Sequence, residues 1–157
     1  MSIDEIKKIR SQLRRSFSGV AWHGPAVQEL LADVTAAMAV ARPLYDSHTI
    51  WELVLHITTW ENAVRRKLAG EPVKPTTQED WPPIQDSSEA AWQQVLAKLE
   101  SEHNQLLEAV SQLTVEDLEK IVAEEEYNVY FMLYGVIQHN IYHAGQISLL
   151  KKAIKKS

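Results

Sequence analysis

Apolar residues recur every three or four positions along most of the chain, which is the spacing of helices with one buried face. The clearest stripe consists of Leu53, Ile57, Trp60, Val64 and Leu68. Ser47 before this stripe is a suitable N-cap, and Gly70 after it is a suitable C-terminal stop. We therefore predict a helix over 47–69, about 33 Å long at 1.5 Å per residue.

Similar stripes and end signals predict helices on both sides of this one. An N-terminal helical segment over 1–20 has its last helical residue near Phe17, and a second helix begins with Pro25 at its first position and stops before Pro43. The remaining helices are expected to begin at Ser87 or Ser88, at Thr114 for a short one, and near Asn128 for a last one that runs to about Ile154.

Residues 71–87 interrupt this pattern with four prolines and scattered polar side chains. We predict a long crossover loop at one end of a bundle, and such loops often act as lids. Elsewhere glycine and proline are few and clustered, which favours long helices over a fold with many turns. The expected fold is therefore all-α, a single domain over 1–157 built as a four-helix bundle with an extra N-terminal helix.

Charge and composition narrow the possible functions. The chain has 16 Lys and Arg against 21 Asp and Glu, a net charge of -5, which argues against nucleic-acid binding. It contains no cysteine, so a disulfide, a thiolate metal site and a cysteine nucleophile are all excluded. No apolar run reaches the roughly 18 residues of a membrane span, and the charged N-terminus is unlike a signal peptide. We expect a cytoplasmic protein that does not bind membranes.

The strongest chemical signal is the pair His139 and His143 near the C-terminus. Residues four apart share one face of a helix, so two imidazoles at this spacing can bind a single cation. Six histidines in a chain of this length would give about 0.2 such pairs by chance, which makes the spacing alone a weak signal. The surrounding helix is apolar nearly all round, however, and buried imidazoles need partners.

A third ligand would give an open metal site of the kind that activates water. His56 is the best candidate because it lies beside the apolar stripe of the helix over 47–69. Glu52, one turn earlier, is a candidate to orient His56 or to act as a general acid or base. Asn140 follows His139 where the zinc-protease motif has glutamate, which disfavours metalloprotease chemistry.

Several neighbouring side chains are candidates to line a substrate pocket. These are Trp60, Met132, Tyr142 and Gln146. Gly135 leaves room one turn before His139, but helical aromatic residues more often fill the core, and that alternative stays open. His103 is expected to be a satisfied core histidine rather than a fourth ligand, and Glu61 is expected on a solvated helix face.

Two motifs make the chain resemble a known family, namely WELVLHITTWE over 51–61 and QHNIYHAGQI over 138–147. Together with WHGPAVQELL over 22–31 and the Trp-Pro-Pro segment over 81–83, they resemble the DinB/YfiT-like superfamily along nearly the whole chain. That superfamily includes thiol-dependent S-transferases and isomerases. The resemblance implies a bundle in up-down-down-up order and a homodimer. It also implies a divalent ion (nickel, zinc, iron or manganese) held by His56, His139 and His143.

We predict from these features a metal-dependent enzyme in which a three-His site activates water or a low-molecular-weight thiol cosubstrate. The reaction would be hydrolysis of a small molecule or S-transfer to it, and the ion would supply the nucleophile that this cysteine-free chain lacks. Two alternatives stay open. One is a non-catalytic module that binds a metal or small molecule on the same bundle, and the other is a structural or stress-response interaction protein without the ion.

Overall fold

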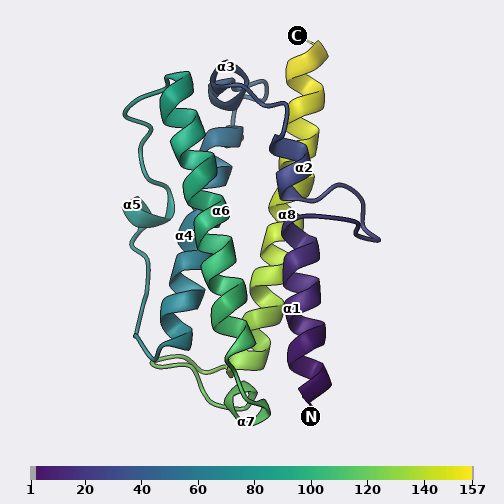
Figure 1. Cartoon of the computed structure of the whole chain (residues 1–157). Coiled ribbons are helices and arrows are strands. Elements are labelled where there is room, and N and C mark those ends of the chain that lie inside the picture. The colour runs from purple at the N-terminus through teal and green to yellow at the C-terminus, as the bar shows by residue number, and fades with distance from the viewer. Residues whose placement is uncertain (1–2, 157) are drawn as a thin grey trace.

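The computed structural model describes residues 3–156, and its regular structure is helical (Figure 1). The helices are α1 (Ile3–Phe17), α2 (Val27–Leu31), α3 (Ala36–Val40), α4 (Ile50–Leu68), α5 (Thr77–Asp80), α6 (Glu89–Ser111), α7 (Val115–Leu118) and α8 (Val129–Lys156). The only β-type pairing among the described residues is an isolated bridge between Ile121 and Asn128. The prediction of an all-α fold is confirmed.

Four long helices lie side by side along the molecule (Figure 1). α4 packs against α6 and α8, and α1 packs against the same two helices. α1 and α8 run in one direction, whereas α4 and α6 run in the other. The chain therefore has to return along the length of the molecule between the end of α4 and the beginning of α6.

That return differs from the crossover predicted over 71–87. It runs along the outside of α4 rather than across one end, and it contains α5 (Figure 1). α5 begins where the hydroxyl of Thr76 accepts the N–H of Glu79 at 3.3 Å. Thr59 on α4 donates its hydroxyl to the carbonyl of Glu79 at 3.0 Å. These contacts fix the end of α5 over one turn of α4.

The segment predicted as one helix over 25–43 consists instead of α2 and α3. Ala26 is the N-cap of α2, so Pro25 stands before the helix and not in its first turn. The hydroxyl of Thr35 accepts the N–H of Met38 and begins α3, because a threonine side chain offers backbone groups an alternative to the helical pattern. The N-terminal helix is consequently one of the four long helices, not an addition to them.

Local contacts at its two ends define where α4 begins and ends. Its N-cap is Thr49 rather than Ser47: the Thr49 hydroxyl accepts the N–H of Glu52, and the Glu52 carboxylate accepts the N–H of Thr49 at 2.7 Å. At the other end, Gly70 has the predicted role, with a φ of +88° that a residue with a side chain adopts only at a cost. α4 therefore presents His56 from a helix capped at both ends.

The core consists of two apolar clusters with buried polar side chains between them. One cluster contains Trp51, Trp92 and Ile147, and the other contains Leu106 and Leu133. Between the two clusters, the long helices contribute buried polar residues, and one from each helix joins a hydrogen-bonded set: Ser16, Glu61, His103 and Asn140. We call these four residues the polar layer. It lies next to the part of α4 and α8 that carries the candidate site.

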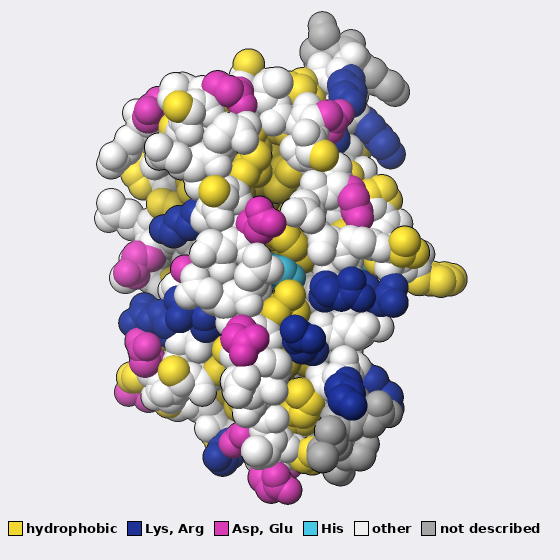
Figure 2. All heavy atoms as spheres, viewed as in Figure 1, with side chains coloured by type: hydrophobic (Ala, Val, Ile, Leu, Met, Phe, Trp, Pro, Cys, Tyr) yellow, Lys and Arg dark blue, Asp and Glu magenta, His cyan; other side chains and the backbone are white. Residues whose placement is uncertain are grey.

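The surface carries charges of both signs. Figure 2 shows acidic and basic side chains interspersed over the face in view. Two aromatic side chains of α8, Phe131 and Tyr142, are exposed. None of the helices in residues 3–156 is long and apolar enough to cross a membrane.

Candidate metal centre

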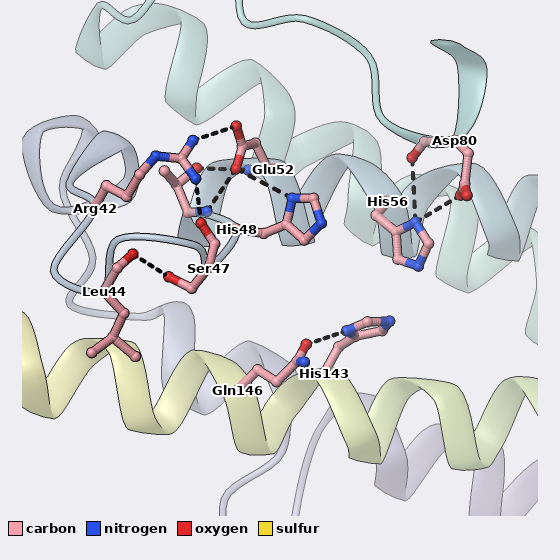
Figure 3. A network of polar contacts seen from close by, with 10 residues as sticks. Arg42, Leu44, Ser47, His48, Glu52, His56, Asp80, His143 and Gln146 are labelled. Carbon is pink, nitrogen blue, oxygen red and sulfur yellow. Dashed lines mark hydrogen bonds and ion pairs between the residues drawn. The ribbon is translucent and has the colours of Figure 1, made fainter. Parts of the chain in front are cut away.

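Three histidines from two helices meet near the middle of the molecule. His56 lies on α4 and His139 and His143 lie on α8, with ligand nitrogens that are all within 4.8 Å of one another. The Nε2 atom of His139 is 2.9 Å from that of His56 and 3.1 Å from that of His143. Figure 3 shows His56 and His143 facing the space between the two helices. The structure therefore brings together the three residues that the sequence predicted as ligands.

The outer nitrogens of two of these rings have acceptor oxygens beside them. His56 Nδ1 is 2.7 Å from Asp80 Oδ1 and 3.3 Å from the Asp80 carbonyl, at the end of α5 (Figure 3). His143 Nδ1 is 2.6 Å from Gln146 Oε1, one turn further along α8. A ring nitrogen that faces an acceptor carries the proton, which leaves a lone pair on Nε2. His139 Nδ1 is buried and has no hydrogen-bond partner among the described residues.

This arrangement fits a shared cation. The Nε2 atoms of His56 and His143 present lone pairs toward His139, whose Nε2 can donate a proton to only one of them. Lone pairs held about 3 Å apart repel each other, and a cation between them removes the repulsion. Three imidazoles and open positions are a donor set that binds zinc, nickel, iron or copper. The residues present therefore fit the divalent ion that the sequence implies.

The electrostatic environment keeps the three rings neutral. Burial, together with a smaller effect of the neighbouring His143 and His56, lowers the pKa of His139 to about 3. Burial is also the main reason why the pKa of His56 lies below its ordinary value, although Asp80 opposes the shift. The pKa of His143 is lowered by burial in the same way, although the hydrogen bond to Gln146 Oε1 opposes the shift. Neutral imidazole is the form that binds metal ions.

Asp80 and Trp81 are the two important residues of the site that the sequence analysis did not assign. Trp60 Nε1 donates to Asp80 Oδ1 at 2.6 Å, which places the carboxylate between Trp60 and His56. The indole of Trp81 stacks on His56 with ring centroids 4.0 Å apart and an interplanar angle of 7°. It stacks on His48 at 3.5 Å and 4°. Two parallel rings so close to one indole cannot share a face, so Trp81 lies between the two imidazoles.

Glu52 is not the residue that orients His56, because Asp80 has that position. The Glu52 carboxylate caps α4 at Thr49, and Arg42 donates to it at 2.8 Å (Figure 3). Partial burial raises the pKa of Glu52, but the Thr49 N–H and the Arg42 guanidinium outweigh it and lower the pKa overall. The contacts of this carboxylate thus lie at the helix end, and its role as a general acid or base stays a prediction.

The four residues predicted to line a pocket have different environments. Trp60 and Met132 line a cavity of about 260 Å³ that His139 also borders. Gln146 faces His143 instead and borders a separate cavity near His48. Tyr142 has 66% of its surface exposed and borders neither cavity. Its ring makes a T-shaped contact with that of His143, with centroids 5.1 Å apart, because successive residues of a helix point about 100° apart.

The prediction that Glu61 lies on a solvated face is wrong. Its side chain is fully buried in the polar layer, where Oε1 is 2.9 Å from His103 Nδ1 and accepts Asn140 Nδ2 at 2.8 Å. Asn140 Nδ2 also reaches Ser16 Oγ at 3.3 Å. His103 is a core histidine, as we expected, but among the described residues only its Nδ1 has a hydrogen-bond partner and its buried Nε2 has none. Its ring stacks on Phe17 at 4.0 Å. The layer thus links all four long helices beside the three-His site.

Comparison with known proteins finds a matching family. The family model described as DinB superfamily matches residues 20–147, which is most of the chain and includes all three histidines. The matched range extends from the residues before α2 into α8 and leaves α1 outside. Neither the curated proteins nor the solved structures gave a match.

Proposed function

This chain belongs to the DinB superfamily, and from that premise we propose that it is a metal-dependent enzyme acting on a small molecule. The observation that carries the proposal is the convergence of His56, His139 and His143 on one point from two helices. Asp80 and Gln146 support it. Each accepts a hydrogen bond from Nδ1 of one ring, Asp80 from His56 and Gln146 from His143, and so directs the Nε2 atom of that ring inward.

The three histidines would hold the ion and leave positions for a reactant. A divalent ion bound there supplies a Lewis acid that makes water or a small thiol a better nucleophile at neutral pH. Neighbouring residues orient and shield the ligand His56: Asp80 fixes its ring, and Trp81 covers one face of that ring. No cysteine is present, so a thiol reactant would come from a cosubstrate.

Metal content tests the first part of this proposal. Protein purified without a histidine tag should contain about one divalent ion per chain, as measured by elemental analysis. His139→Ala and His56→Ala should lose most of that metal. His23→Ala is the matched control, because His23 is an exposed histidine remote in sequence from the site. Equal metal content in all four proteins would overturn the three-His assignment.

Turnover tests the second part. The metal-loaded protein should hydrolyse a p-nitrophenyl ester, or should accelerate the attack of added cysteine on 1-chloro-2,4-dinitrobenzene, in which a carbon–sulfur bond forms and chloride leaves. His139→Ala should remove the acceleration. Turnover that survives this substitution would contradict metal catalysis. Metal binding without turnover of any substrate would instead support the alternative of a non-catalytic binding module.

The order and direction of the helices in the bundle belong to the same proposal. We propose that the four long helices form the up-down-down-up bundle that the family resemblance implies, which the helix directions in Figure 1 support. The homodimer, the cytoplasmic location and the identity of the metal stay predictions. Sedimentation of the purified protein and competition among zinc, nickel, iron and manganese address the first and the last.

A further inference from the structure

An apolar cavity extends from the candidate metal centre along α4 and α8. It has a volume of about 260 Å³, and its lining includes Trp60, Lys67, Tyr127, Met132, Gly135 and His139. Apart from His139, Lys67 and the hydroxyl of Tyr127, its lining is apolar. A cavity of about 150 Å³ is sufficient for benzene, so this one has room for a six-membered ring with a short substituent.

The two ends of the cavity differ in chemistry. Trp60 and His139 lie at one end, with ring centroids 6.2 Å apart. Lys67 and Tyr127 lie at the other, where Lys67 Nζ donates to the tyrosine hydroxyl at 3.0 Å. Lys67 follows Trp60 by seven positions along α4, which is about 10 Å of helix. A ligand in this cavity would therefore have its reactive end at the metal centre and its body along the two helices.

Gly135 leaves part of the cavity wall without a side chain. It lies within α8, where glycine destabilises a helix by roughly 0.5–1 kcal/mol relative to alanine. Its φ is not in the positive range that favours glycine, and a Cβ built on it meets no atom within 4 Å. Neither backbone conformation nor close packing therefore requires a glycine here. What the missing side chain does is leave open the wall of the cavity one turn from His139.

The cavity offers no net charge to a ligand. Lys67 is the only ionised side chain of the lining, and Glu125 pairs with it at 2.5 Å. Burial opposes the charge on Lys67, but the bonds to Glu125 and Tyr127 outweigh it and raise the pKa of the lysine. The ammonium is thus charged and neutralised by its partner. An anionic ligand body would gain little binding free energy here, whereas an uncharged apolar body would bind by displacing water from the apolar walls.

Resting on the proposed function above, we propose that this cavity binds the uncharged, monocyclic apolar body of the substrate, with its reacting group at the His139 end. The substrate class is then a small aromatic or alicyclic electrophile no longer than about two helical turns. Gly135 is the residue that sets the size limit. The proposal needs no residue beyond those that line the cavity and no movement of the helices.

Two hydroxamic acids with the same metal-binding group test the proposal in zinc-loaded protein. Benzohydroxamic acid carries a ring for the cavity, whereas acetohydroxamic acid carries only a methyl group. Benzohydroxamic acid should bind at least about tenfold more tightly, as measured by isothermal titration calorimetry. Gly135→Leu should reduce this ratio to about one while the affinity for acetohydroxamic acid stays within about twofold. Gly135→Ala should give an intermediate ratio and covers the case in which leucine prevents folding.

Gly145→Leu is the matched control. Gly145 lies on the same helix, is exposed and also has no atom within 4 Å of a built Cβ, but it does not line the cavity. Its variant should keep the wild-type ratio of the two affinities. Equal binding of the two hydroxamic acids by wild-type protein would overturn the proposal, as would a full ratio in Gly135→Leu.

A second measurement separates this proposal from that of the metal centre. Phenol is added to metal-free wild-type protein, and the methyl resonance of Met132 is followed by NMR. A saturable shift that is lost in Gly135→Leu and kept in Gly145→Leu would support the cavity even if no hydroxamic acid binds. Absence of any shift in the wild type would overturn the cavity as a binding site, whatever the metal measurements give.

Discussion

Asp80 Oδ1 lies 2.7 Å from His56 Nδ1, although the two residues come from different helices and α5, which carries the aspartate, is only one turn long. A carboxylate in this position fixes the ring orientation and raises the basicity of the nitrogen that faces the ion. Asp80→Ala should therefore weaken zinc binding by about 10- to 100-fold, and Asp80→Asn by less, in chelator competition. Asp86→Ala is the control, because Asp86 lies on the same connection and accepts only from Ser88. Unchanged affinity in Asp80→Ala would contradict the orienting role.

Trp81 should control how fast the metal leaves. Its indole covers one face of His56, so removing the ring opens that side of the site to water and to chelators. Stacking of two rings is worth about 0.5–1.5 kcal/mol, which corresponds to a roughly 2- to 13-fold change in rate. Trp81→Ala should release zinc to a chelator faster by about this factor in stopped-flow measurements. Trp22→Ala should not, since Trp22 is fully exposed.

The Glu61–His103 pair should behave as a unit in stability measurements. Both side chains are buried, with relative exposures of 0% and 1%. His103→Leu leaves a carboxylate in the core without this partner, and we expect it to reduce the free energy of unfolding by about 3–5 kcal/mol. Glu61→Leu should also destabilise, whereas the double variant should lose clearly less than the sum of the two losses. Urea denaturation measures all three, and additive losses would show that the two residues do not interact.

The Lys67–Glu125 pair should make the free energy of unfolding depend on pH. The hydrogen bond from Lys67 is the main reason why the pKa of Glu125 lies below its ordinary value of 4.5. A carboxyl group with a lowered folded-state pKa stabilises the protein above its unfolded pKa, and this contribution is lost as the pH falls through the folded value. Wild type should exceed Glu125→Gln in unfolding free energy by about 1 kcal/mol at pH 6–8.

The difference between these two proteins should shrink below pH 4.5 and disappear at lower pH, where the carboxyl group is protonated in both states. Urea denaturation over pH 3–8 measures it. Glu126→Gln provides the comparison from the same acidic run, because none of the contacts of Lys67 involves Glu126. A difference that is independent of pH would contradict the ion pair.

The sequence alone predicts those parts of the site in which the residues lie on a single helix. His139 and His143 lie on one face because four residues make about one turn, and nothing beyond α8 is needed to predict this. His56 was predicted from its place beside an apolar stripe, and the family resemblance named the same residue. Asp80 could not be found in this way. Its position depends on the path of a proline-rich connection, and only the neighbouring Trp81, in the motif shared with the family, gave a signal.

The errors also have physical causes. Glu61 was assigned to a solvated face because a glutamate is rarely buried unless it is paired, and its partner His103 is on another helix. The helix over 25–43 was predicted as continuous because its apolar spacing is helical. The Thr35 hydroxyl interrupts it, as does the Val34 carbonyl, which accepts Trp92 Nε1 at 2.7 Å. Thr35 acts locally, but the contacts of Trp92 with Val34 and of His103 with Glu61 come from a helix far away in the sequence.

The polar layer has a consequence for how this chain assembles. Ser16, Glu61, His103 and Asn140 meet only if all four helices sit at one relative height. A slip of any helix by a single turn, about 5.4 Å, would leave the carboxylate of Glu61 enclosed by aliphatic groups with nothing to offset its charge. Compact but misaligned states are therefore penalised, and the chain folds into the one alignment that also places His56 opposite His139 and His143.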